Sequence, residues 1–226
     1  MSAAAGPDVI QDGLVLCLDA ANKKSYPGSG TVWTDLAGTN NGTLTNSPTF
    51  SSENSGLINF DGVNDYVQIN YTGNFVSTSY TIGVFAKHNG ARDNRRTIVG
   101  FSNGGDAAYK VYNMQIWDSD LGFLSFVGDN TNFTSYQITL PDPFSNWHYF
   151  TSVITPSNII TYVNGISYYN SSSIALRGSF DRIWLGRRID QYWKGWIPNF
   201  TLYNRALTPA EILQNYNATK GRFRLT

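Results

Sequence analysis

The feature that most constrains this chain is a series of short apolar or alternating segments, separated by glycine, asparagine, aspartate and proline. Each segment is long enough for a β-strand, and the residues between segments favour turns. Long helical periodicity is absent until the end of the chain. We therefore predict an all-β sandwich or barrel. The clearest segments are residues 14–18, 57–60, 66–69, 80–86, 97–101, 109–117, 121–127, 136–140, 147–154, 159–163, 166–169, 182–185 and 196–203.

Two local motifs predict their own geometry. Asn164-Gly165 lies between two alternating segments and accepts the positive φ angles of a type I′ turn, which predicts a β-hairpin. Thr208-Pro209-Ala210-Glu211 is a capping box with proline at the first helical position, which predicts a helix that ends near Gly221. We expect this helix to lie across the end of the sandwich and to cover an exposed sheet edge.

Length and charge narrow the class of protein. The 226 residues suit one large all-β domain, which we place at residues 12–226 after an N-terminal arm at residues 1–11 that is mobile or bound to a partner. Sixteen basic residues balance sixteen acidic ones, so the chain lacks the excess of positive charge that binds nucleic acid. Charged residues make up only 14% of the chain, which suits a protein within an assembly and allows a homo-oligomer.

Targeting features point to a chain made without a signal peptide. The first residues have neither a basic nor an apolar region, and no apolar run is long enough to span a membrane. We therefore expect no contact with a membrane. The single cysteine, Cys17, cannot form an intrachain disulfide.

An ordered set of motifs extends from about Gly13 to Gly221 and resembles the laminin-G-like, concanavalin A-like lectin/glucanase superfamily. The set comprises residues 12–20, 25–30, 33–36, 41–44, 58–67, 146–149, 162–165, 185–188 and 202–208. The resemblance implies a jelly-roll β-sandwich of two antiparallel sheets, one of them concave, with one short C-terminal helix. Domains of this family occur in lectins, in carbohydrate-binding modules and in polysaccharide-cleaving enzymes.

The opening and closing motifs look most like versions found in structural proteins of marine bacteriophages. That resemblance implies a non-enzymatic virion protein, a capsid decoration or surface/fibre protein. It would be made in the host cytoplasm, would lie on the virion surface and would contact the major capsid protein. The alternative is a lectin-like module that recognises a host-surface or environmental polysaccharide.

Catalytic patterns are weak in this chain, and we predict that it is not an enzyme. Hydrolases of this fold carry a Glu-x-Asp-x-Glu strand that supplies paired carboxyl groups, whereas this chain has only Glu53 and Glu211. Residues 100–104 match a nucleophile elbow around Ser102, with His148 as a conceivable base. That elbow works at a strand-to-helix turn, and no helix pattern follows here.

Metal and glycan ligands complete the predicted sites. Lectins of this superfamily often bind Ca²⁺, and Asp61, Asn64 and Asp65 are candidate oxygen ligands, although the same residues also suit turns. Relatives often carry an aspartate where this chain has Pro198, so we predict no metal and no other cofactor. For a glycan, flat aromatic rings beside polar side chains are the expected surface. The candidate glycan-binding residues are Arg187, Asp190, Gln191, Tyr192, Trp193 and Trp117. Among the tryptophans, we expect Trp117 and Trp193 to be exposed. We expect Trp33, Trp147 and Trp184 to lie in the core.

Overall fold

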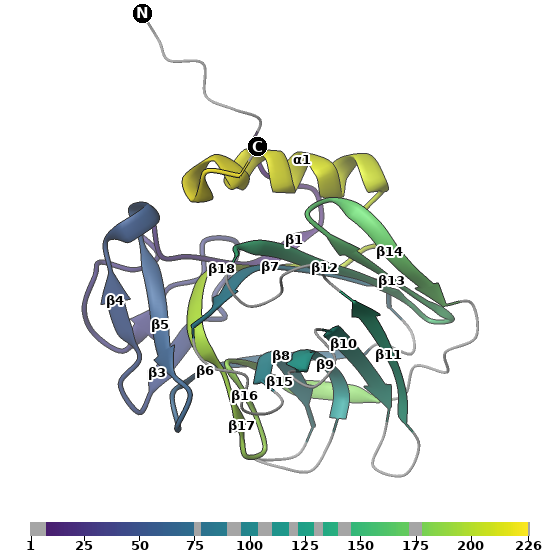
Figure 1. Ribbon diagram of the computed structural model, residues 1–226, viewed down its shortest axis with the longest axis horizontal. Coiled ribbons are helices and arrows are strands. Elements are labelled where there is room, and N and C mark those ends of the chain that lie inside the picture. Colours follow the sequence, from purple (N-terminus) through teal and green to yellow (C-terminus); the bar gives the residue numbers. More distant parts are fainter. Residues whose placement is uncertain are drawn as a thin grey trace, which may run out of the picture.

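Two antiparallel β-sheets stack face to face in this protein (Figure 1). The computed structural model describes residues 8–74, 78–89, 96–103, 110–117, 122–128, 133–139, 146–171 and 178–225. All strand pairs in the described part are antiparallel, which confirms the predicted jelly-roll sandwich. In this same part, no helix has the length and hydrophobicity needed to cross a bilayer.

The first sheet, sheet A, has eight strands in the described residues, in the order β14-β13-β12-β7-β18-β5-β4, and β1 also pairs with β18. Its strands are β1 (Leu14–Asp19), β4 (Thr49–Ser51), β5 (Leu57–Asp61), β7 (Tyr80–His88), β12 (His148–Thr155), β13 (Asn158–Val163), β14 (Ile166–Ser171) and β18 (Lys194–Tyr203).

The second sheet, sheet B, has eight strands in the described residues, in the order β11-β10-β9-β8-β15-β6-β3-β2. Its strands are β2 (Val32–Trp33), β3 (Gly42–Thr45), β6 (Tyr66–Asn74), β8 (Arg96–Ser102), β9 (Lys110–Trp117), β10 (Gly122–Gly128), β11 (Phe133–Thr139) and β15 (Ser179–Leu185). A small hairpin, β16 (Arg187–Arg188) and β17 (Gln191–Tyr192), forms a separate two-stranded sheet. The helices are η1 (Glu53–Ser55), α1 (Pro209–Lys220) and η2 (Gly221–Phe223).

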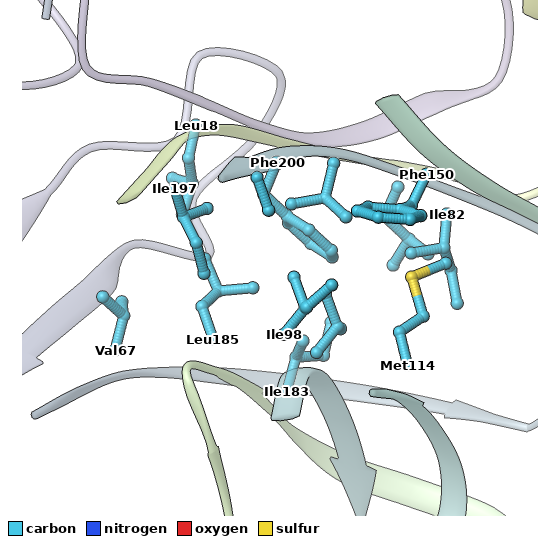
Figure 2. Close-up of a cluster of buried hydrophobic side chains, with 14 of the residues drawn as sticks. Leu18, Val67, Ile82, Ile98, Met114, Phe150, Ile183, Leu185, Ile197 and Phe200 are labelled. Carbon is cyan, nitrogen blue, oxygen red and sulfur yellow. The ribbon is translucent and has the colours of Figure 1, made fainter. Parts of the chain in front are cut away.

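The main core lies between the two sheets. In Figure 2, Ile82, Phe150 and Phe200 point down from sheet A, and Ile183 and Met114 point up from sheet B. Strand alternation causes this arrangement, because every second side chain of a strand faces the partner sheet. The side chains between these core-facing residues along each strand point outward, and they determine what each outer face can bind.

The sequence predicted the long strands and missed the short ones. Each of the thirteen apolar segments overlaps a strand, and Asn164 and Gly165 adopt φ angles of 52° and 79° in the turn between β13 and β14, which confirms the predicted hairpin. The five missed strands, β2, β3, β4, β16 and β17, have two to four residues each. Such strands are too short to show an apolar pattern of their own.

The C-terminal helix begins as predicted but covers a different surface. Thr208 and Glu211 form the reciprocal capping box. The helix lies over the outer face of sheet A rather than over a sheet edge (Figure 1). Tyr216 packs there against Phe85 and Tyr149. The prediction of an edge cover is wrong because sheet A is apolar on both faces, and the larger gain comes from burying its outer face.

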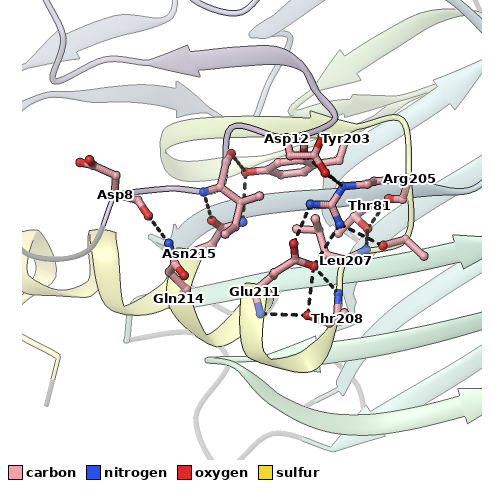
Figure 3. Close-up of polar contacts among 12 residues, drawn as sticks. Asp8, Asp12, Thr81, Tyr203, Arg205, Leu207, Thr208, Glu211, Gln214 and Asn215 are labelled. Atoms are coloured by element: carbon pink, nitrogen blue, oxygen red, sulfur yellow. Dashed lines mark hydrogen bonds and ion pairs between the residues drawn. The ribbon is translucent and has the colours of Figure 1, made fainter.

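The first described residues are bound to this helix, as Figure 3 shows. The backbone N–H of Ile10 donates to Asn215 Oδ1 at 2.8 Å, and the hydroxyl of Tyr203 donates to the carbonyl of Ile10 at 3.0 Å. Gln214 Nε2 donates to the carbonyl of Asp8 at 2.8 Å. These contacts cross the boundary predicted at residue 12, so residues 8–11 pack on the sandwich, while residues 1–7 lie outside the described residues.

Arg205 clamps the N-terminal segment to the helix cap. Its guanidinium donates two hydrogen bonds to Glu211, at 3.0 and 2.6 Å, and its Nε lies 2.9 Å from Asp12 Oδ2. The hydrogen bonds from Arg205, together with those from Thr208, lower the pKa of Glu211 from 4.5 to about 2. Thr81 Oγ1 donates to the carbonyl of Arg205 and accepts from Leu207 N, which fixes the connection from β18 to α1.

The lowered pKa of Glu211 gives stability a defined pH dependence. The carboxylate stabilises the fold fully above the unfolded-state pKa of 4.5, and this contribution is lost as the pH falls to about 2. We expect Glu211→Gln to lower the free energy of unfolding at pH 7 by about 0.5–1 kcal/mol, because the ion pair is lost while the capping acceptor is kept. Urea unfolding between pH 2 and 7 measures both effects. Glu53→Gln is the matched control, and identical acid profiles for Glu211→Gln and the natural protein would contradict the clamp.

The hairpin of β16 and β17 contains strained backbone. Ile189, the first residue after β16, has a φ angle of 54° and is 39% exposed. A β-branched residue is disfavoured in the left-handed region because its side chain crowds the backbone, at a cost of about 1–3 kcal/mol.

We expect Ile189→Gly to stabilise the protein by about 1 kcal/mol, because glycine removes the strain and the exposed side chain contributes little packing. The midpoint of urea unfolding measures this change. Ile166→Gly, at an exposed strand position after the other hairpin turn, is the control and should destabilise the protein by about 0.5–1 kcal/mol. Destabilisation by Ile189→Gly would show that the turn is held by contacts of the Ile189 side chain.

Candidate functional site

The outer face of sheet B carries polar and aromatic side chains in place of the apolar ones that face the core. In β6, Val67 and Ile69 point into the core, so Tyr66 and Gln68 point outward. In β15, Ile183 points inward and Trp184 therefore points outward. Because β6 and β15 are paired neighbours, their outward side chains form one continuous surface.

An arginine lies on the aromatic part of this face. The guanidinium carbon of Arg187 lies 4.6 Å from the ring centre of Tyr66, 5.0 Å from that of Trp184 and 5.8 Å from that of Tyr192. Tyr66 and Trp184 pack edge to face, with their ring centres 5.4 Å apart. The planar cation thus extends the aromatic surface and adds N–H donors to it.

Side-chain amides join the hairpin to the sheet beside these rings. Gln115 Nε2 donates to Thr97 Oγ1 at 3.0 Å and to Gln191 Oε1 at 2.9 Å. Arg188 also donates to Gln191 Oε1, at 3.2 Å. Arg96 donates to the backbone carbonyl of Tyr192 at 3.0 Å. These bonds hold the hairpin against β8 and β9, so its side chains keep fixed positions over the sheet.

The structure brings together three of the predicted glycan-binding residues. Arg187, Gln191 and Tyr192 are partly exposed on this face, and Asp190 is exposed at the turn of the hairpin. Trp117 ends β9, and its side chain lies outside the described residues.

Trp193 does not belong to the site, and the prediction that it is exposed is wrong. Its side chain is 0% exposed, packs in the main core and contacts the ring of His88 edge to face. Tyr192 points outward, so strand alternation turns the next side chain inward as the chain enters β18. The predicted burial of Trp33, Trp147 and Trp184 is confirmed, but Trp184 is covered by Arg187 rather than by sheet A.

Sequence reasoning missed Tyr66, Trp184 and Gln115 as parts of this site. The alternation of β6 would have placed Tyr66 on the outward face together with Gln68. Gln115 gave no signal, because only the pairing of β9 with β8 brings it next to Thr97.

The residues of the nucleophile-elbow pattern do not form an elbow. Ser102 ends strand β8 of sheet B, and its Oγ accepts a hydrogen bond from Trp184 Nε1 at 2.8 Å. His148 begins β12 of sheet A, with Nδ1 3.4 Å from Asn164 Nδ2. The next described element after Ser102 is strand β9, so the strand-to-helix turn that aims such a serine does not follow in the described residues.

The candidate calcium ligands act within a turn. Asp61 Oδ1 accepts from Val63 N at 2.7 Å, and Asp65 Oδ2 accepts from Asp61 N at 3.0 Å. Burial is the main reason that the pKa of Asp65 is raised to about 6. Among the described residues, no group of three or more His, Cys, Asp or Glu side chains could hold a metal ion. The hydrogen bonds of Asp61 and Asp65 to backbone amides match the turn interpretation of these residues.

Two further side chains that could be charged or reactive are those of Arg96 and Cys17. In the basic segment 92–96, only Arg96 lies within the described residues, and it binds the backbone carbonyls of Gly62 and Tyr192. Cys17 lines a small cleft of about 230 Å³ beside α1. Burial raises the pKa of its thiol to about 12, which leaves it unreactive near neutral pH.

Comparisons with known proteins agree with this architecture. The solved structures that it resembles include the sialidase of Trypanosoma rangeli, with a TM-score of 0.71 at 15% identity over 93% of this chain and 33% of the sialidase. They also include the botulinum neurotoxin serotype D binding domain, with a TM-score of 0.69 at 14% identity over 92% of this chain and 52% of that one. A structure of the serotype D domain with N-acetylneuraminic acid gives a TM-score of 0.71 at 14% identity over 92% of this chain and 51% of that one.

The identities of these structures are low, so they show the shared fold alone, and the chain spans about one third to one half of their length. No curated protein sequence matches the chain. A family model described as the concanavalin A-like lectin/glucanases superfamily (Laminin_G_3) matches residues 61–213, which is more than half of the chain. This protein therefore belongs to the concanavalin A-like lectin/glucanase superfamily.

Proposed function

We propose that this protein is a non-catalytic carbohydrate-binding module, and that its glycan site is the outer face of sheet B beside the β16–β17 hairpin. The observation that carries the proposal is the stacking of Arg187 on Tyr66 and Trp184, with Tyr192 beside them. The partly exposed rings of Tyr66 and Tyr192 can cover the C–H face of a sugar, while the guanidinium of Arg187 and the amide of Gln191 can bond its hydroxyls.

The fold neighbours support a binding role. Among these neighbours, botulinum neurotoxin binding domains form complexes with N-acetylneuraminic acid and with rat synaptotagmin II, and cell entry of botulinum neurotoxin type C depends on interaction with two ganglioside molecules. The sialidase among the neighbours makes catalysis the competing possibility.

The carboxyl groups of this chain argue against glycoside hydrolysis. Glycoside hydrolases need two carboxyl groups across the scissile bond. Neither glutamate belongs to a strand of sheet B: Glu53 is in η1, and Glu211 caps α1 and pairs with Arg205. Asp190 is exposed at the turn of the hairpin. Binding is therefore the function that the described residues of this face support.

The second candidate function is a structural role on a bacteriophage virion, with the major capsid protein as a partner. Its support is the resemblance of the opening and closing motifs to marine phage structural proteins, together with a chain that is only 14% charged. Mass spectrometry of purified virions from the source tests it. Many copies per particle would support decoration, a handful would indicate a tail or fibre position, and absence would exclude the virion role while leaving the glycan site intact.

Two substitutions on the hairpin test the glycan site. We expect Arg187→Ala and Tyr192→Ala each to weaken glycan binding about tenfold or more, since each removes a planar contact surface and Arg187 also removes donors. A glycan array identifies a ligand of the natural protein, and calorimetry then compares its affinity for each variant.

Arg224→Ala, at an exposed residue near the C-terminus, is the matched control and should bind with unchanged affinity. Thermal unfolding of each variant confirms that the fold is retained. The proposed site would be refuted if the natural protein bound no glycan, or if both hairpin variants bound the glycan as tightly as the control.

A further inference from the structure

A hollow lies beside β3 and β4, where the connection after β1 meets the connection between β3 and β4. It has a volume of about 470 Å³, within the range of about 300–1,000 Å³ that is typical of ligand pockets. Its lining comes from residues 26–31 and 44–50 and shares no residue with the hairpin site. Figure 1 shows β3 and β4 to the side of the β16–β17 hairpin.

Two aromatic rings contribute to the lining of the hollow: the ring of Phe50 is partly exposed, and the ring of Tyr26, which is 3% exposed, is buried against it. The ring centres of Tyr26 and Phe50 lie 5.6 Å apart, with their planes tilted by 44°. The hydroxyl of Tyr26 donates to the carbonyl of Gly30 at 2.8 Å, which ties the overlying loop to the ring. Leu44, which also lines the hollow, is buried, and its N–H donates to the carbonyl of Thr31 at 2.8 Å. The aromatic surface is therefore held in place by the loop above it.

The rest of the lining is polar but uncharged. Ser29, Thr31 and Ser47 are exposed there, and in the described part of the chain no hydrogen bond engages the hydroxyls of Ser29 and Ser47. No lysine, arginine, aspartate or glutamate is among the lining residues. An ionic ligand would lose its hydration there without gaining a partner of opposite charge, so the chemistry fits a neutral ligand.

The backbone around the hollow is shaped by two consecutive residues in the left-handed region. Asn46 and Ser47 have φ angles of 64° and 79°. Asn46 is further fixed by its Nδ2, which donates to the carbonyl of Asn64 at 2.9 Å. These conformations cost free energy in residues other than glycine, and here they place a hydroxyl and an amide at the edge of an aromatic surface.

We propose that this hollow is a second carbohydrate subsite, and that it binds a neutral sugar ring against the partly exposed ring of Phe50 and among the surrounding hydroxyls. The inference rests on the carbohydrate-binding function proposed above. It involves different residues, and their uncharged side chains favour a neutral sugar, whereas the hairpin site contains the charged Arg187. A chain with two separated subsites could hold one long glycan at two points, which raises avidity without new contacts at either point.

Nuclear magnetic resonance on the ¹⁵N-labelled full chain tests the subsite, with maltose, cellobiose and lactose as the neutral probes. We expect at least one of these sugars to shift the backbone amide signals of residues 26–31 and 44–50. Thr31→Trp places a large side chain in the hollow and should abolish these shifts. Thr39→Trp, at an exposed threonine outside the lining, is the matched control and should preserve them.

The Arg187→Ala variant separates this inference from the proposed function. If the shifts at residues 26–31 and 44–50 persist in Arg187→Ala and vanish in Thr31→Trp, the hollow is an independent site, whatever the hairpin binds. The inference is overturned if none of the three sugars shifts these signals, if the shifts survive Thr31→Trp in a folded protein, or if Arg187→Ala removes them. Loss of array binding in Arg187→Ala alone bears only on the hairpin site.

Discussion

Aromatic packing on the outer face of sheet A is the interaction on which the rest of this structure depends. Phe85 stacks on Tyr149 with ring centres 4.8 Å apart and on Phe223 with ring centres 4.6 Å apart, although its neighbours in β7 face the main core. A sheet that is apolar on both faces must be covered twice, because exposed rings of this size are costly in water. Sheet B covers one face, and α1 with η2 covers the other. The capping box, the Arg205 clamp and the bonds from residues 8–11 all serve to hold that second cover in place.

This division leaves the outer face of sheet B without a covering helix in the described part of the chain. The small β16–β17 hairpin lies there instead, and it brings polar groups and an arginine rather than an apolar surface. Its turn carries strain at Ile189, which persists because the hydrogen bonds of Gln115 and Arg96 fix the hairpin from both sides. A strained, well-held loop over an amide-rich sheet face is a suitable frame for a binding site, since its side chains are positioned before a ligand arrives.

Several acidic side chains of this protein make structural contacts rather than contributing to the proposed binding surfaces. Glu211 and Asp12 are bound to Arg205, Asp19 is bound to Arg222, and Asp61 and Asp65 cap backbone amides in a turn. The hollow beside β3 and β4 is lined by neutral residues alone. The groups available at the two proposed sites are aromatic rings, amides, hydroxyls and the Arg187 guanidinium. Such groups can bind the faces and hydroxyls of a sugar, but they are poorly suited to acid–base catalysis.

The sequence by itself determined the elements with strong local codes: the long strands, the Asn164-Gly165 turn and the helix that begins after Thr208. These follow from side-chain periodicity and backbone preferences, which act over a few residues. It also indicated the segment of the hairpin site, because Arg187, Gln191 and Tyr192 are close in sequence. Only the tertiary structure decided that Trp193 faces the core, that Trp184 lies beneath Arg187, and that α1 covers a face rather than an edge. Those outcomes depend on which strands pair and which face each strand turns to its partner, and such long-range pairings are not encoded in any single segment.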